Sequence, residues 1–93
     1  MKYQDRFAKA LKKARKARGL TQEDFSSLSS RTYVSTLERG MKSPTLSKIN
    51  ELAEILNIHP LTLLVLAYAP SADPAKVDAL LRQIERESRT INS

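Results

Sequence analysis

Apolar residues recur at steps of three and four along most of the chain, which is the period of an α-helix. The first such stripe runs over residues 3–17 and ends before a glycine. It consists of Tyr3, Phe7, Ala10, Leu11, Ala14 and Ala17. No segment shows the strict alternation of apolar and polar residues that is typical of a strand. The pattern therefore predicts an all-α fold.

Residues that favour helix ends divide the rest of the chain into further helices. Thr21 is expected to begin a brief second helix, with Asp24 as its partner in a capping box. The third helix is expected over residues 31–39, with Ser30 as its N-cap. Thr45 is expected to begin the fourth, whose apolar stripe is Leu46, Ile49, Leu52, Ala53 and Leu56.

The ends of these helices are also marked. The only two glycines, Gly19 and Gly40, follow the first and third helices, where we expect them to form left-handed C-terminal caps. Asn57 ends the fourth helix. A fifth helix over residues 61–69 is apolar almost all round, and His59 precedes it as an N-cap or an exposed loop residue.

A linker over residues 70–74 leads to a sixth, amphipathic helix, whose polar tail from Ser88 onward is expected to fray. A chain of 93 residues is long enough for one domain. We therefore expect a five-helix domain over residues 1–69, followed by a linker and a C-terminal amphipathic helix over residues 70–93.

The charge is unevenly distributed. The net charge is +6, but the first 42 residues hold eleven Lys and Arg against four Asp and Glu, a balance of +7, and the remainder carries −1. Such asymmetry indicates that the first half faces a polyanion. The alternative is a solvated lysine-rich helix face, formed by Lys9, Lys12, Lys13 and Lys16.

Several function classes are disfavoured. The chain has no cysteine, which excludes disulfides and thiolate zinc sites and fits a reducing cytoplasm. With a single histidine, His59, we expect no metal site and no cofactor. No nucleophile, base and orienting group occur together, so we expect no enzyme. The longest apolar run, residues 60–69, is about half of the ~20 residues that a membrane span needs, so no membrane association is expected.

Two short helices joined by a tight turn, within the basic half, form the arrangement that places a helix in the major groove of DNA. On the third helix, Val34 and Leu37 face inward. The outer face holds Arg31, Thr32, Ser35, Thr36 and Arg39. Arginine can bind guanine through two hydrogen bonds, and threonine offers a hydroxyl and a methyl group to base edges. This face is therefore a candidate reader of bases.

Four segments around these helices resemble the phage-repressor and Cro-like (Xre-type) helix-turn-helix family. They are Leu20-Thr21-Gln22-Glu23-Asp24-Phe25, Val34-Ser35, Leu37-Glu38-Arg39-Gly40 and Pro44-Thr45-Leu46. The resemblance covers approximately residues 7–67. It implies a lambda-repressor-like, five-helix domain that binds operator double-stranded DNA as a homodimer.

The resemblance also implies roles for single residues. Arg31, Thr32 and Thr36 match base-contacting positions, and Ser35 shares their face. Residues that match phosphate-contacting positions are Gln22, Ser30, Arg39 and Lys42. Tyr33 is expected to pack at the edge of the third helix, with a phosphate contact through its hydroxyl as a second possibility. Arg15 and Glu38 match a partly buried ion pair that ties the first helix to the third.

One departure concerns the turn. The link between Phe25 and Val34 is two residues shorter than the family pattern and contains a serine cluster in place of the usual glycine. A shorter turn is expected either to tilt the third helix or to end the second helix a turn early. It weakens the individual base-contact assignments more than the assignment of the family.

The fifth and sixth helices carry more apolar surface than one side of a short helix can bury. We expect them to form a dimer interface, because operator binding in this family needs two recognition helices one DNA turn apart. The expected contacts are Leu63, Leu66, Val77, Leu80, Leu81 and Ile84. The alternative is that the sixth helix covers the core of its own chain.

These features together predict a sequence-specific transcriptional regulator, with repression by promoter occlusion as the default mechanism. An alternative is an antitoxin or adaptor whose helices mainly bind a protein partner. A third reading is an architectural protein that binds DNA without sequence preference.

Overall fold

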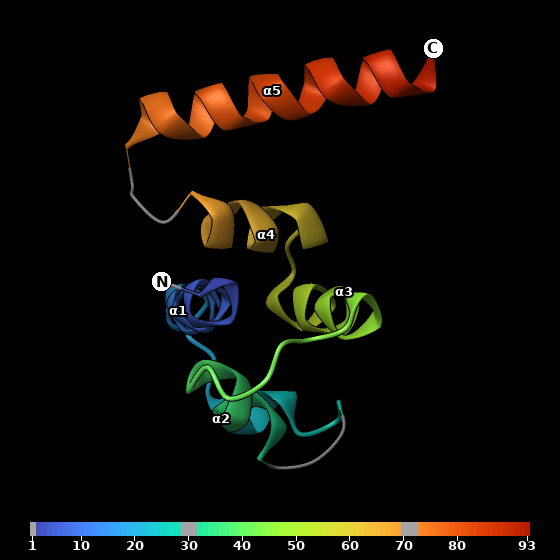
Figure 1. Ribbon diagram of the computed structural model, residues 1–93. Coiled ribbons are helices and arrows are strands. Elements are labelled where there is room, and N and C mark those ends of the chain that lie inside the picture. The colour runs from blue at the N-terminus through green and yellow to red at the C-terminus, as the bar shows by residue number, and fades with distance from the viewer. Residues whose placement is uncertain (1, 29–31, 70–72) are drawn as a thin grey trace.

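Figure 1 shows the computed structural model, which describes residues 2–28, 32–69 and 73–93. Within these ranges every regular element is a helix, so the all-α prediction is confirmed. The elements are α1 (Tyr3–Ala17), η1 (Gln22–Phe25), α2 (Tyr33–Glu38), α3 (Leu46–Leu56), α4 (Pro60–Tyr68) and α5 (Pro74–Asn92). The prediction of Ser30 as an N-cap lies outside the described residues.

The predicted C-terminal caps are present. Gly19 and Gly40 adopt φ angles of +68° and +71°, and Asn57 adopts +57° at the end of α3. Left-handed backbone of this kind is unfavourable for residues with a Cβ other than Asn and Asp. These three residues therefore end α1, α2 and α3 through their own conformational preferences.

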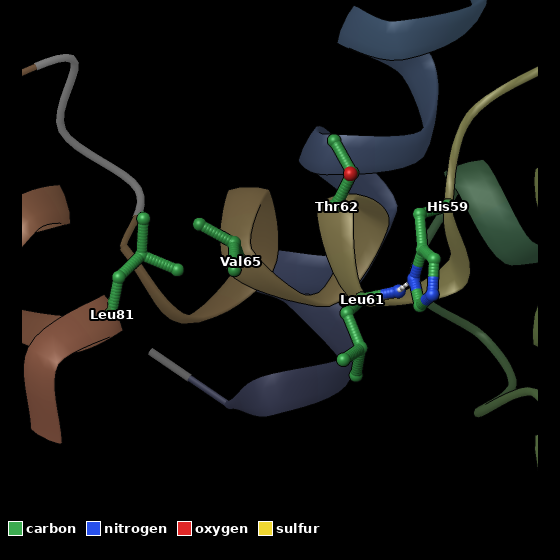
Figure 2. Close-up of a pocket in the computed structure, with 5 residues that line it drawn as sticks. All are labelled: His59, Leu61, Thr62, Val65 and Leu81. Atoms are coloured by element: carbon green, nitrogen blue, oxygen red, sulfur yellow. Dashed lines mark hydrogen bonds between the residues drawn. The ribbon is translucent and has the colours of Figure 1, made fainter. Parts of the chain in front are cut away.

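Two predicted N-caps are also confirmed. The Thr45 hydroxyl oxygen accepts a hydrogen bond from the Lys48 backbone N–H at 3.2 Å, and His59 Nδ1 accepts one from the Leu61 N–H at 3.0 Å (Figure 2). Each bond satisfies a donor that the first turn of a helix cannot satisfy internally. His59 is thus accounted for as a cap of α4.

The second helix is shorter and tighter than predicted. η1 is one turn of 3-10 helix, and its Thr21 backbone N–H donates to the Asp24 carboxylate at 2.7 Å, as in a capping box. Four residues are too few for the repeated hydrogen bonds of an α-helix, and the serines that follow favour turns over helix continuation. A short 3-10 turn is the consequence.

The core forms around α1, which packs chiefly on α4 and on α2, while α3 packs on α4. Its buried side chains are Phe7, Ala10, Leu11, Ala14, Phe25, Val34, Leu37, Ile49, Leu52, Leu56, Leu63 and Ala67. The two large residues of the predicted stripes that lie outside it are Leu46, 72% exposed at the first position of α3, and Tyr3, 61% exposed. Both begin their helices, where the first turn extends past the packed core. Tyr3 instead stacks on Tyr68, with ring centroids 4.9 Å apart.

α5 differs from the other helices because none of its residues is buried and it packs only sparsely on the chain. In Figure 1 it lies beyond α4, at the end of the molecule opposite α2. The prediction that the tail frays from Ser88 is wrong, since the helix continues to Asn92. An ion pair between Arg89 and Glu85 at 3.0 Å, four residues apart, spans this last part of the helix.

None of the described helices alone has the length and hydropathy of a membrane span; α3 and α4 meet the criterion only as a pair bent by 104°.

Candidate nucleic-acid interface

α2 is held against the core by one face. Val34 and Leu37 are buried against α1, as the pattern predicted. Of the predicted base-contacting residues, Thr32 is exposed at the N-cap of α2 and Ser35 and Thr36 are half-buried on the helix. Arg31 lies outside the described residues. Burial of one face therefore leaves Thr32, Ser35 and Thr36 with accessible surface on a single short helix.

The hydroxyl of Thr36 is oriented by its own helix. It donates a hydrogen bond to the Thr32 carbonyl oxygen at 2.8 Å. Because this bond uses the hydroxyl proton, the Thr36 oxygen remains as a hydrogen-bond acceptor beside its methyl group. Such a side chain suits a base edge that donates a hydrogen bond or carries a methyl group.

The ion pair expected between α1 and α2 is present. Arg15 Nε lies 2.7 Å from Glu38 Oε2, and Arg15 Nη2 lies 3.0 Å from Glu38 Oε1, which is a bidentate arrangement. The side chains are only 12% and 4% exposed. Hydrogen bonding to the Glu38 carboxylate, which accepts from the guanidinium, raises the pKa of Arg15 above its usual value, although burial opposes this. Arg15 Nη1 also donates to the Leu20 carbonyl at 3.0 Å, so the guanidinium joins three segments.

Gln22, a predicted phosphate contact, is attached to this pair. Its Nε2 donates to Glu38 Oε1 at 3.1 Å, which links the first residue of η1 to α2. An amide nitrogen has two N–H groups, and this bond uses one of them. The buried carboxylate therefore orients the Gln22 side chain while one donor remains for a phosphate oxygen.

Cationic side chains border the same region. Arg39 follows α2 directly and Lys42 lies in the next turn, and both are exposed. Within the described ranges, neither has an ion-pair partner. The same holds for the lysines of α1, which remain exposed on its outer face: Lys9, Lys12, Lys13 and Lys16.

Tyr33 begins α2 and is half-buried. Burial raises the pKa of its hydroxyl above the usual value, although the charge of Lys48 opposes the shift. Lys48 Nζ lies 5.8 Å from the centre of the ring. At neutral pH the phenol is therefore protonated and can donate a hydrogen bond, as the predicted phosphate contact requires.

Lys48 was not recognised from the sequence as a residue of this region. Its Nζ donates to the Leu28 carbonyl at 3.0 Å and forms an ion pair with Glu51 at 3.0 Å. The charge pair three residues apart is visible in the sequence, but the bond to Leu28 spans 20 residues and only the fold creates it. Lys48 thus fastens the end of the turn after η1 to α3.

A second accessible feature lies at the other end of the molecule, where an apolar groove of about 550 Å³ separates α4 from α5. Its lining is mainly aliphatic and includes Leu61, Leu64, Val65, Tyr68, Leu80, Leu81 and Ile84. Figure 2 shows its neighbouring part, where Leu81 of α5 approaches Val65 of α4. Together, the lining residues Leu61, Leu64, Val65, Tyr68, Leu80, Leu81 and Ile84 define the groove between α4 and α5.

The prediction that Leu63 contacts a second chain is wrong. Leu63 is 0% exposed, because it faces α1 in the core of its own chain, and Leu66 also packs against that core. The α5 residues of the prediction remain accessible, with Leu81 46% and Ile84 40% exposed, whereas Val77 and Leu80 are half-buried. Only part of the predicted contact set is thus available to another molecule.

Among the described residues, no cluster of three or more His, Cys, Asp or Glu side chains is arranged to bind a metal ion.

Comparison with known proteins gives a family match. The sequence model of the helix-turn-helix family matches residues 11–63, a range that contains η1, α2 and α3. No curated protein matches the chain.

Solved structures provide further similarities. The restriction-modification controller protein C.AhdI from Aeromonas hydrophila is 37% identical, with a TM-score of 0.61 over 64% of this chain and 90% of that chain. Two structures of the clp gene regulator ClgR from Corynebacterium glutamicum are 23% and 24% identical. Their TM-scores are 0.70 and 0.71, over 78% and 94% of this chain and 97% and 95% of those chains. The likeness to ClgR concerns the fold alone.

Proposed function

The chain belongs to the helix-turn-helix family of DNA-binding transcriptional regulators, and from this premise we propose that it binds an inverted-repeat operator as a homodimer and represses transcription. The observation that carries the proposal is the accessible surface of Thr32, Ser35 and Thr36, accompanied by the oriented amide of Gln22 and the exposed cations Arg39 and Lys42. The protein acts by occupying a promoter in the cytoplasm and catalyses no reaction.

In this proposal the two sets of side chains have different tasks. Ser35 and Thr36 of α2, the recognition helix, contact base edges together with its N-cap Thr32 and with Arg31. Phosphate contacts come from Gln22, Ser30, Tyr33, Arg39 and Lys42. Phosphate contacts fix the register of a protein on the duplex, and base contacts determine its sequence preference. The exposed lysines of α1 raise the association rate by attracting DNA at a distance.

The groove between α4 and α5 supports the proposed dimer. Leu61, Leu81 and Ile84 leave a substantial apolar surface uncovered in a single chain. A second copy provides a matching surface, because a two-fold dimer brings the same patch from both subunits together. It also supplies the second recognition helix, which an inverted repeat requires at a distance of ~34 Å.

Selection of bound sites from random duplex DNA tests this function directly. We expect the selected pool to converge on a palindromic motif with half-sites about one helical turn apart. An unenriched pool with steep salt dependence would instead support an architectural DNA-binding protein. An unenriched pool together with a stable protein partner would support the antitoxin or adaptor reading.

Two arginine variants separate phosphate contacts from base contacts. Arg39→Ala is expected to weaken binding to all sequences about equally and to reduce the slope of log K against log salt by about one. Arg31→Ala is expected to relax the preference at one base pair, by roughly 1–3 kcal/mol. Titrations against operator and random duplexes at several salt concentrations measure both effects. As a control, Arg89→Ala on α5 should leave the salt slope unchanged. If Arg31→Ala reduces the affinity for the operator and for random duplexes equally, Arg31 makes no base contact.

A further inference from the structure

The Gln4 side chain bonds the turn between α2 and α3 to the first turn of α1. Gln4 Nε2 donates to the Gly40 carbonyl oxygen at 2.8 Å, and the Ser43 hydroxyl donates to Gln4 Oε1 at 3.3 Å. These bonds join residues that are 36 and 39 positions apart in the sequence. One amide group therefore binds both ends of the turn that carries Lys42.

Gly40 lies close to α1, and a side chain at this position would require the Asp5 carboxylate to move. A Cβ at this position would lie 2.6 Å from Asp5 Oδ1, which is too close for two such atoms. The φ angle of +71° also disfavours any larger residue. The Gly40 backbone thus lies beside α1, where its carbonyl oxygen accepts the hydrogen bond from Gln4.

Apart from Gln4, the turn is held near its two ends, and at the second end the half-buried Pro44 lines a pocket together with residues of α1. The N–H groups of Gly40 and Met41 donate to carbonyl oxygens of α2 at 3.0 and 3.2 Å, which holds the start of the turn. The side chains of Met41, Lys42 and Ser43 are exposed and make no apolar anchor in the core. The half of the turn that carries Lys42 and Ser43 is reached by the Gln4 side chain.

We propose that Gln4 is a positioning residue for DNA binding, which holds the turn so that Lys42 meets a backbone phosphate. This inference rests on the proposed function. A lysine that is already held near its phosphate loses less conformational freedom on binding than one on a free turn. Supporting residues of this kind increase affinity without touching the ligand.

A double-mutant cycle with Lys42 tests the proposal in the full-length protein. Gln4→Ala is expected to weaken operator binding by about fivefold and to reduce the salt slope, while its melting temperature stays within a few degrees of wild type. Lys42→Ala is expected to weaken binding to a similar extent. In the Lys42→Ala background, Gln4→Ala is expected to cost less than about twofold, because the contact that it positions is already absent.

Asn50→Ala provides a matched control, since Asn50 is an exposed amide on α3 that is placed in no DNA contact. It should change neither affinity nor salt slope. If Gln4→Ala does not fold, Ser43→Ala removes the 3.3 Å bond without altering α1 and should show a smaller loss with the same dependence on Lys42.

The outcomes separate this inference from the proposed function. Additive losses for Gln4→Ala and Lys42→Ala, or an unchanged affinity of Gln4→Ala, would overturn the positioning role while leaving operator binding intact. A wild-type protein that prefers no duplex sequence would overturn the proposed function and this inference with it.

Discussion

Replacing Glu38 with alanine is expected to lower the free energy of unfolding by roughly 3–5 kcal/mol, because it leaves a buried guanidinium without its carboxylate. Arg15, only 12% exposed, would keep its bond to the Leu20 carbonyl but lose both bonds to Glu38. In a domain of this size, each kcal/mol shifts the melting temperature by about 4–8 °C. Thermal melts followed by circular dichroism should therefore show a decrease of at least about 12 °C.

An exposed pair of the same chemistry serves as the control. Arg89 and Glu85 also approach to 3.0 Å, but their side chains are 80% and 62% exposed, so Glu85→Ala should cost less than about 1 kcal/mol. The double variant Arg15→Met, Glu38→Leu should recover much of the stability, because it leaves no unpaired charge. If Glu38→Ala melts within a few degrees of wild type, the ion pair does not have the stabilising role assigned to it.

Removing residues 71–93 is expected to weaken self-association and operator binding together. Two linked recognition helices bind an inverted repeat more tightly than either alone, because the second contact becomes intramolecular. Loss of the α5 surface should therefore reduce operator affinity by about 10²–10⁴-fold at low protein concentration. Sedimentation and operator titrations measure the two effects on the same samples.

A full-length variant tests the same interface without truncation. Leu81 and Ile84 line the groove and are partly exposed in the single chain, so Leu81→Asp with Ile84→Asp should break the dimer and leave the core of α1 to α4 folded. Ala79→Asp, on an exposed position of α5 that does not line the groove, is the matched control. A truncated chain that still sediments as a tight dimer would contradict the role of α5, though not that of α4.

The features that the sequence by itself determined are those with local causes. Gly19, Gly40 and Asn57 end helices because left-handed backbone is accessible to glycine and asparagine wherever they occur. Thr45 and His59 cap helices through bonds to residues two or three positions away. The apolar period likewise depends only on residues within one helix, so the all-α fold and the inward face of α2 were predictable from the sequence.

The resemblance to a known family also allowed one long-range contact to be predicted. The Arg15–Glu38 pair spans 23 residues, and no spacing rule connects them. Its prediction depended on the match of both residues to a family pattern. The second helix is where local reasoning was least effective, because residues 22–25 form one turn of 3-10 helix and the predicted helix is longer.

Only the tertiary structure decided which apolar residues are covered and which polar side chains meet. α4 is apolar almost all round, so its sequence cannot indicate that Leu63 enters the core whereas Leu61 remains 57% exposed. The bonds of Gln4 to Gly40 and of Lys48 to Leu28 join separate segments, and no local pattern encodes them. Burial and side-chain partnership depend on how helices pack against one another, whereas helix formation and capping depend mainly on residues within about one turn.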